Sequence, residues 1–123
     1  MPTQHQKTIG ETGEELACCE LRRRGYAILA RRYRTRLGEI DIIARDEGVL
    51  VFVEVKARSG YHFGGPLAAV TAVKQRKLIR MALDYLARSG LSGRPCCFDV
   101  VGVLIRDGRP ELEVVTNAFG AGW

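Results

Sequence analysis

Hydrophobic and polar positions follow two different periods along the chain, and these periods predict where helices and strands lie. Residues 9–24 have a helix-forming composition, and Gly25 follows at the position of a left-handed helix cap. A second helix is expected to begin after Thr71, whose hydroxyl can cap the first turn, and to end near Gly90. Its apolar positions recur at helical spacing: Leu78, Met81, Ala82, Tyr85 and Leu86.

Five further segments are rich in the branched and aromatic residues that are typical of strands. Three of them lie between the two helices: residues 26–34, 37–45 and 49–57. Two more follow the second helix: residues 97–105 and 111–116. Residues 59–66 read as a glycine-rich loop, and Asp107-Gly108 as a turn. The order α-β-β-β-α-β-β predicts an α/β fold with a central mixed sheet flanked by helices.

The size and composition of the chain predict one globular domain. It has 123 residues, of which 46% are hydrophobic, so a core can form and disordered, collagen-like and disulfide-scaffold classes are excluded. We expect residues 1–123 to form this domain, with residues 1–8 as a flexible tail. Neither a signal peptide nor an apolar run long enough to cross a membrane is present, so we expect a cytoplasmic protein without a membrane partner.

Positive charge is concentrated in one stretch of the chain. The formal net charge is +5, and the segment between Leu21 and Leu37 contains no acidic residue. It holds seven arginines: Arg22, Arg23, Arg24, Arg31, Arg32, Arg34 and Arg36. The planar guanidinium suits phosphate oxygens, so we expect DNA contacts from Arg31, Arg32, Arg34 and Arg36. The alternative interpretation is a solvated basic face that binds no ligand.

An acid and a base share one face of the third predicted strand. Side chains two positions apart point to the same side of a strand, so Phe52, Glu54 and Lys56 project together. The valines that alternate with them cover the opposite side. This strand is apolar enough to be central, and central strands seldom carry an acid and a lysine without a function. A half-exposed strand with solvated ion pairs is the alternative.

The length of the preceding turn determines whether a second carboxylate joins Glu54. A two-residue turn at residues 47–48 places Asp41 directly opposite Glu54. A turn at residues 46–47 places Asp41 opposite Phe52 and diagonal to Glu54, still on one face. A three-residue loop would send the two carboxylates to opposite faces and remove the proposed site.

Two facing carboxylates repel each other unless a cation lies between them. Oxygen ligands favour Mg²⁺ or Mn²⁺, which also bind phosphate oxygens, and this combination is typical of phosphodiester hydrolysis. Lys56 could then deprotonate or hold the attacking water, or offset charge in the transition state.

The four cysteines occur as adjacent pairs, whose side chains diverge, so we expect reduced thiols rather than a zinc site.

These residues resemble a known family. GEIDIIA followed by LVFVEVKAR resembles the YraN-like family of small bacterial proteins. It is also similar to the PD-(D/E)XK nuclease signature, with Asp41 as the first acid and Glu54-Val55-Lys56 as E-X-K; Ile40 stands where that signature has proline. The resemblance implies a restriction-endonuclease-like core, related to Holliday junction resolvases. It also implies Mg²⁺ or Mn²⁺ held by Asp41, Glu54 and the backbone carbonyl of Val55.

Three more residues are candidates by their positions. Glu14 shares a helical face with the residues expected to meet the sheet: Ala17, Cys18 and Leu21. It is a candidate third carboxylate, with Glu15 as the competing choice. Gln75 continues the buried stripe of the second helix and is expected either to contact the metal water or a phosphate, or to form a hydrogen bond at the helix start. Arg58 shares the face of Lys56 and is a candidate DNA contact.

We therefore expect a metal-dependent DNA endonuclease, with branched or distorted DNA as a candidate substrate. The alternative is a catalytically silent nucleic-acid-binding or scaffold module with the same fold. A third hypothesis is a nuclease-like domain that works only within a partner complex. A homodimer would supply two sites for two strands.

Overall fold

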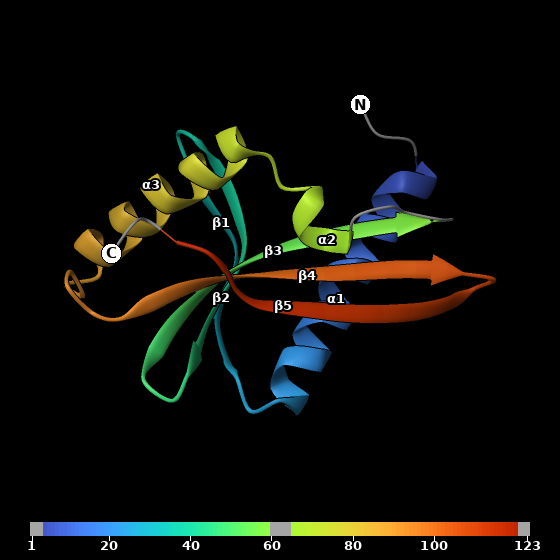
Figure 1. Cartoon of the computed structure of the whole chain (residues 1–123), viewed down its shortest axis with the longest axis horizontal. Coiled ribbons are helices and arrows are strands. Elements are labelled where there is room, and N and C mark those ends of the chain that lie inside the picture. Colours follow the sequence, from blue (N-terminus) through green and yellow to red (C-terminus); the bar gives the residue numbers. More distant parts are fainter. Residues whose placement is uncertain (1–3, 60–64, 121–123) are drawn as a thin grey trace.

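The computed structural model describes residues 4–59 and 65–120. For residues 4–11 and 58–59 it describes the backbone alone. Figure 1 shows the arrangement of the elements. They follow one another as α1 (Gln4–Arg23), β1 (Ala27–Thr35), β2 (Gly38–Asp46), β3 (Val49–Ser59), α2 (Gly65–Ala68), α3 (Ala72–Arg88), β4 (Cys96–Arg106) and β5 (Arg109–Phe119).

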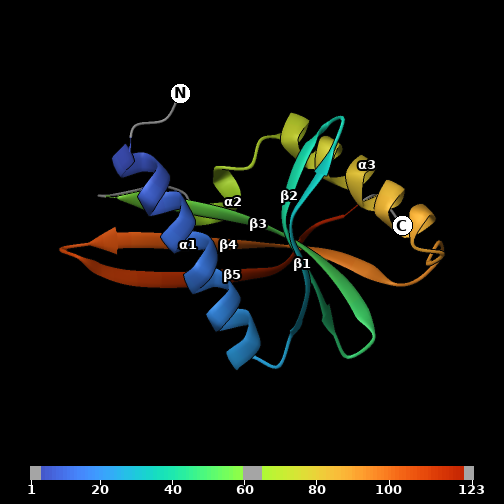
Figure 2. The same ribbon diagram turned by 180° about the vertical axis from the view of Figure 1, so that it is seen from behind.

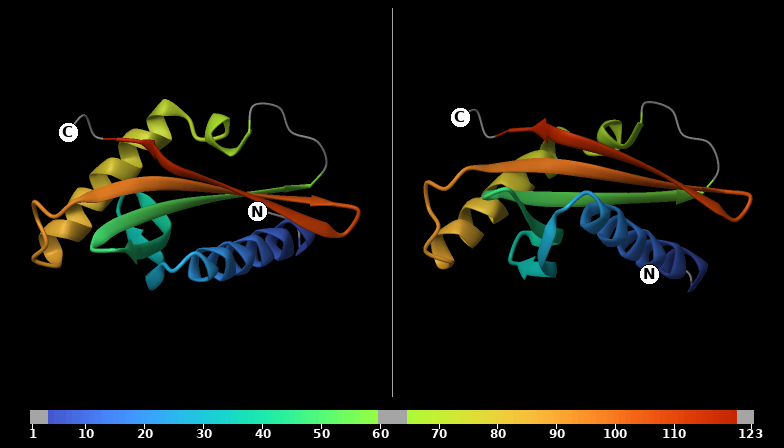
Figure 3. Two further views of the ribbon diagram at one scale, coloured as in Figure 1. Left: turned by 60° about the horizontal axis from the view of Figure 1, so that its bottom comes forward. Right: turned by 90° about the horizontal axis from the view of Figure 1, so that it is seen from below.

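The five strands form one mixed sheet in the order β1-β2-β3-β4-β5. β3 and β4 pair in parallel, and the other neighbouring strands are antiparallel. α1 lies on one face of this sheet, and α2 and α3 lie on the other (Figures 2 and 3). The predicted α/β fold is confirmed as a mixed α/β domain consistent with a restriction-endonuclease-like fold.

Each face of the sheet has its own hydrophobic cluster, because alternate strand residues point to opposite faces. The cluster under α3 consists of Ile40, Ile43, Leu50, Phe52, Val70, Leu78, Met81, Ala82, Leu86, Phe98 and Val100. The cluster under α1 consists of Ala17, Cys18, Leu21, Ile42, Ala44, Val51, Val53, Val101 and Val103. β3 contributes to both, as expected for a central strand with neighbours on each side.

Local signals in the sequence place the ends of the two long helices. α1 ends in a Schellman arrangement: Gly25 has φ +95°, and the N–H of Tyr26 donates to the carbonyl of Leu21 at 3.0 Å. The Thr71 hydroxyl accepts the N–H of Lys74 at 3.1 Å, so the predicted cap of α3 is confirmed. α1 begins earlier than predicted, and residues 4–8, expected in a tail, are helical.

The turn between β2 and β3 fixes their register. Glu47 and Gly48 have φ +48° and +83°, the two left-handed residues that a tight hairpin turn needs. β2 and β3 pair from Asp46 opposite Val49 to Ile42 opposite Val53. The register with a turn at residues 47–48 is therefore confirmed.

The connection from β3 to α3 is described only in part. Residues 60–64 of the predicted glycine-rich loop lie outside the described residues. From Gly65 the chain forms the single turn of α2, which lies against β4: a Cβ on Gly102 would come within 2.7 Å of the Pro66 side chain. Within residues 4–59 and 65–120, no helix is both long enough and apolar enough to cross a membrane.

A candidate metal centre

Asp41 lies where β2 stops pairing with β3. The last paired residues are Ile42 and Val53, so the register places Asp41 beside Glu54 just beyond the ladder. There the Asp41 carboxylate replaces a backbone acceptor, because its Oδ2 atom accepts the Val55 N–H at 2.8 Å. The side chain of Asp41 therefore lies close to Glu54 and its neighbours at the point where strand pairing ends.

Glu54 lies on the α3 face of β3 and is only 5% exposed. Two lysines flank its carboxylate: Lys56 Nζ lies 3.7 Å from Oε1, and Lys74 Nζ lies 3.9 Å from Oε2. Within the described part of the chain, Oε2 is buried and has no hydrogen-bond partner. A buried oxygen without a partner is costly, and it marks a place where a ligand would be stabilising.

α1 brings a third carboxylate to this place, and a glycine permits its approach. Gly13 is buried against β3, where a Cβ at this position would lie 2.6 Å from the Ala57 Cβ. The next residue, Glu14, has a side chain that is 13% exposed, whereas the Glu15 side chain is 71% exposed. The structure therefore turns Glu14, not Glu15, toward the sheet.

Two further carboxylates lie close to Asp41, one from α1 and one from β2. Oxygen atoms of Glu14, Glu39 and Asp41 lie within 4.8 Å of one another, a spacing at which one cation can bind them all. Glu39 is two residues before Asp41 on β2 and was not singled out from the sequence. The alternation of strand side chains is the signal that could have identified it.

The carboxyl groups perturb one another. Burial, and then the charges of Glu54 and Glu14, raise the pKa of Asp41 from its usual 3.8 to about 7, although the Val55 N–H opposes this. Burial also raises the pKa of Glu54, while the charges of Lys74 and Lys56 oppose that rise. Asp41 and Glu54 therefore form a crowded acidic pair that a cation would relieve.

The arginines predicted to bind DNA lie close to acids. Arg32 Nε donates to Glu14 Oε2 at 2.8 Å, and Arg31 lies 3.8 Å from Glu15 and 4.0 Å from Glu14. Arg34 lies 3.3 Å from Glu39. Arg36 is exposed at the turn after β1, and the side chain of Arg58 lies outside the described residues. Part of the basic stretch thus neutralises the acidic centre itself.

Two neighbouring residues of α3, Lys74 and Gln75, make different contacts. The Gln75 side chain donates to the Val70 carbonyl at 3.1 Å, which is the helix-start hydrogen bond considered as its alternative role. Lys74, which sequence reasoning did not single out, contacts Glu54 instead. The signal was present, because Lys74 precedes the buried Leu78 by four residues and so continues its stripe.

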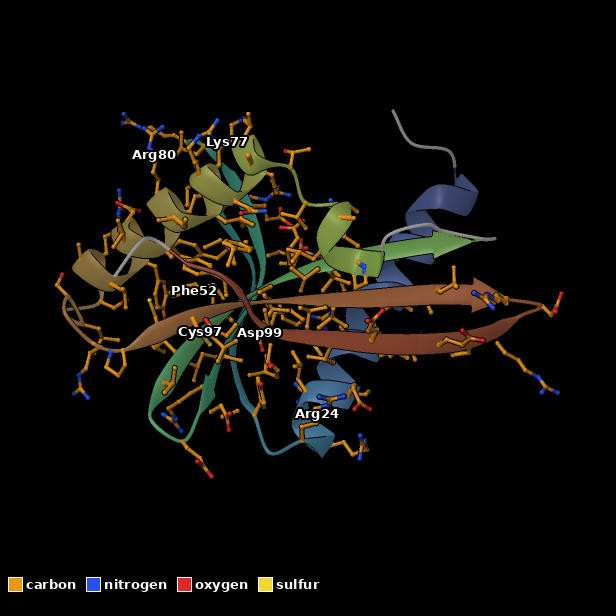
Figure 4. All side chains as sticks on the ribbon, viewed as in Figure 1. Arg24, Phe52, Lys77, Arg80, Cys97 and Asp99 are labelled. Atoms are coloured by element: carbon orange, nitrogen blue, oxygen red, sulfur yellow. The ribbon has the colours of Figure 1, made fainter. Side chains whose placement is uncertain are left out.

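Asp99 is a further buried acid, and its contacts assign it to the fold. It accepts the backbone N–H of Asn117 at 2.9 Å and the Tyr26 hydroxyl at 3.1 Å. The Asn117 bond lies where the register between β4 and β5 shifts, so Asp99 replaces a lost ladder partner. Figure 4 shows it close to Cys97, which is a free thiol like the other three cysteines.

The arrangement suits a hard divalent cation. Its donors are carboxylate oxygens, the ligand type that Mg²⁺ and Mn²⁺ prefer: those of Glu14, Glu39 and Asp41. Beside Asp41 lies Glu54, whose buried Oε2 atom has no hydrogen-bond partner among the described residues. Lys56 and Lys74 lie 3.7 Å and 3.9 Å from the two oxygens of Glu54. The residues therefore fit a divalent metal with a cationic side chain beside it.

The fold and this centre together define a single-domain α/β protein of restriction-endonuclease-like architecture with an acidic, lysine-flanked site. The chain belongs to the uncharacterised protein family UPF0102, the YraN family, whose model matches residues 13–103. This match includes Glu14, Asp41, Glu54 and Lys56.

Curated relatives match nearly the whole chain. A UPF0102 protein of Symbiobacterium thermophilum is 53% identical over 116 residues, which cover 94% of this chain and 98% of the relative. One from Geotalea uraniireducens is 48% identical over 114 residues, covering 92% and 90%. One from Geobacter metallireducens is 44% identical over 115 residues, covering 94% of each. These names state no activity, so function has to be argued from the residues.

Proposed function

We propose that the protein is a cytoplasmic DNA endonuclease that depends on Mg²⁺ or Mn²⁺. The observation that carries this proposal is the pairing of Asp41 with the buried Glu54. The Oε2 atom of Glu54 lacks a hydrogen-bond partner among the described residues, while Lys56 lies 3.7 Å from Oε1. Two buried acids side by side destabilise a fold, so their presence beside a lysine favours a catalytic role over a purely structural one.

Asp41 and Glu54 would hold the metal, with the backbone carbonyl of Val55 as a further ligand. The N–H and C=O of one strand residue point the same way, and the Val55 N–H is directed at Asp41. Glu14 would complete the acidic set from α1. When bound, such a metal activates water and offsets phosphate charge.

Lys56 and Lys74 have different proposed roles beside Glu54. Lys56 shares the face of Glu54, so it can hold or deprotonate the attacking water and stabilise charge that grows on the phosphate. Lys74 Nζ lies 3.9 Å from the other oxygen of Glu54, and its charge favours the ionised form of that carboxylate. A contact of Gln75 with the metal water or a phosphate stays a prediction.

DNA is the proposed substrate because phosphodiester oxygens complete the ligand set of Mg²⁺ in such sites and the chain is basic. Branched DNA is the substrate form we propose to test first. A homodimer would place two such centres on two strands.

The experiment is an incubation of the protein with linear, single-stranded, nicked and four-way DNA, with Mn²⁺, with Mg²⁺ and with a chelator. We expect cleavage that requires the metal and that Asp41→Asn abolishes. Binding of DNA without cleavage of any of the four substrates would favour the catalytically silent module. Cleavage by Asp41→Asn at the wild-type rate would reveal a contaminating nuclease.

A further inference from the structure

A second basic surface lies in a hollow between the β1–β2 hairpin and α3. The hollow has a volume of about 570 Å³. Its charged lining consists of Arg34 and Arg36 from the hairpin and of Arg80, Asp84 and Arg88 from α3. Four arginines face one aspartate, so the lining is strongly positive and attracts anions.

These residues belong to rigid elements of the fold. Arg80, Asp84 and Arg88 are spaced four residues apart, so they form one stripe along α3. On the other wall, the ring of Tyr33 packs edge-on against Tyr85 with centroids 5.2 Å apart, and this contact fastens the hairpin to α3. The hollow is therefore part of the fold and does not depend on a loose loop.

The hairpin turn that carries Arg36 is itself held by hydrogen bonds. The Thr35 hydroxyl accepts the N–H of Leu37 at 3.0 Å and donates to the carbonyl of Gly38 at 3.2 Å. The backbone of Arg36 lies between these bonds, so the turn sets the position from which its side chain extends.

The arginines of the hollow differ in what neutralises them. Arg88 Nε lies 3.0 Å from Asp84, and Arg34 Nε lies 3.3 Å from Glu39. Arg36 and Arg80 are exposed, and neither forms an ion pair with any residue in the described ranges. An unpaired guanidinium presents its whole donor fork to solvent, and that fork matches two oxygens of a phosphate group.

α3 connects this hollow with the acidic centre. Lys74 at its first turn contacts Glu54, and Lys77 and Arg80 follow three and six residues later. Six residues of helix span about 9 Å, so Arg80 lies well within the reach of one nucleic-acid strand from the centre. Figure 4 shows Lys77 and Arg80 extending outward from the end of α3 that lies by the hairpin.

We infer that this arginine-lined hollow binds the phosphate backbone of the DNA substrate beside the scissile position. The inference rests on the proposed function and deepens it, because it assigns the main DNA contacts to Arg36 and Arg80. Arg31 and Arg32 are already paired with Glu14 and Glu15 and serve the acidic centre instead.

The test is the affinity of the full chain for a fluorescent DNA duplex, measured by anisotropy over a range of salt concentrations with a chelator present, so that no cleavage occurs. Each phosphate contact contributes about 0.9 to the slope of log affinity against log salt. Arg36→Gln with Arg80→Gln should lower this slope by about 1.8 and raise Kd on the order of 10-fold. Arg45→Gln with Arg109→Gln removes equal charge from exposed positions at the two distant turns and should leave the slope unchanged.

A gain of binding provides a second arm that misfolding cannot imitate. Asp84→Asn removes the acid from the hollow and releases Arg88, so it should tighten binding and raise the slope by about 0.9. A slope unchanged in both the arginine variant and Asp84→Asn would overturn the inference. So would equal displacement of the duplex by polyglutamate at the same charge concentration, which would assign the hollow to acidic polypeptides.

The outcomes also separate this inference from the proposed function. If the wild type binds DNA through Arg36 and Arg80 but cleaves none of the four DNA forms, the hollow is supported as a DNA site and the proposed nuclease activity is contradicted. If the wild type cleaves DNA with metal, and the Arg36 and Arg80 variant has the same slope and Kd as the wild type, the nuclease activity is supported. The hollow is then excluded as a DNA site. No DNA binding by the wild type would overturn both.

Discussion

Asp41 makes the stability of the metal-free protein depend on pH in an unusual direction. Its pKa rises from 3.8 to about 7 in the folded state, so folding favours the protonated form. The stabilisation is complete below the unfolded pKa of about 4 and is lost as pH rises through about 7. In a chelator, the wild type should therefore lose stability between pH 4 and pH 8.

The size of this effect follows from the same values. A rise from 3.8 to about 7 corresponds to about 4 kcal/mol, at ~1.4 kcal/mol for each pH unit. Because Glu54 competes for the same proton, we expect roughly half of this, about 2 kcal/mol. For a chain of 123 residues, 1 kcal/mol moves Tm by roughly 4 °C, so the expected shift is about 8 °C.

Asp41→Asn isolates this contribution, because the amide oxygen can still accept the Val55 N–H but carries no charge. Thermal unfolding followed by circular dichroism should give similar Tm values for both proteins at pH 4. At pH 8 the variant should be more stable by roughly 8 °C in chelator, and Mn²⁺ should raise the Tm of the wild type alone. The exposed Asp107→Asn is the control. Parallel pH profiles of wild type and Asp41→Asn would refute the reasoning.

Three further variants test the parts of the centre. Lys56→Ala should keep DNA affinity and lose on the order of 10²-fold or more in the rate of single-turnover cleavage, because a group that stabilises growing charge acts mainly on turnover. A cleavage rate equal to that of the wild type would exclude a catalytic role of Lys56. Gly13→Val should lower unfolding stability by about 1–3 kcal/mol in urea titrations, because its side chain would collide with Ala57. Glu14→Gln should weaken Mn²⁺ binding in calorimetry while Glu15→Gln should not; equal affinities would exclude Glu14.

The sequence reduced the pairing of Asp41 with Glu54 to a question of turn length, because strand side chains repeat every two residues. A two-residue turn at residues 47–48 leaves one register, and that register brings the two carboxylates together. The helix caps at Gly25 and Thr71 were predictable for a similar reason, since each depends only on nearby residues.

Tertiary contacts explain what the sequence could not show. The run between Leu21 and Leu37 contains no acid, yet Glu14 and Glu39 reach its arginines from α1 and β2. Which of Lys74 and Gln75 contacts Glu54 depends on how α3 is rotated against the sheet. Such a rotation is set by core packing, and adjacent helix residues differ by about a third of a turn.

Calorimetric titration with Mn²⁺ at pH 7, in two buffers of different ionisation enthalpy, tests most directly whether Asp41 and Glu54 hold a divalent metal. Metal binding must displace the proton that the raised pKa of Asp41 retains, so the wild type should bind Mn²⁺ and release protons. Asp41→Asn and Glu54→Gln, each shown to be folded by circular dichroism, should lose this binding. A wild type that binds no Mn²⁺, or two variants that bind it as the wild type does, would contradict the proposed centre.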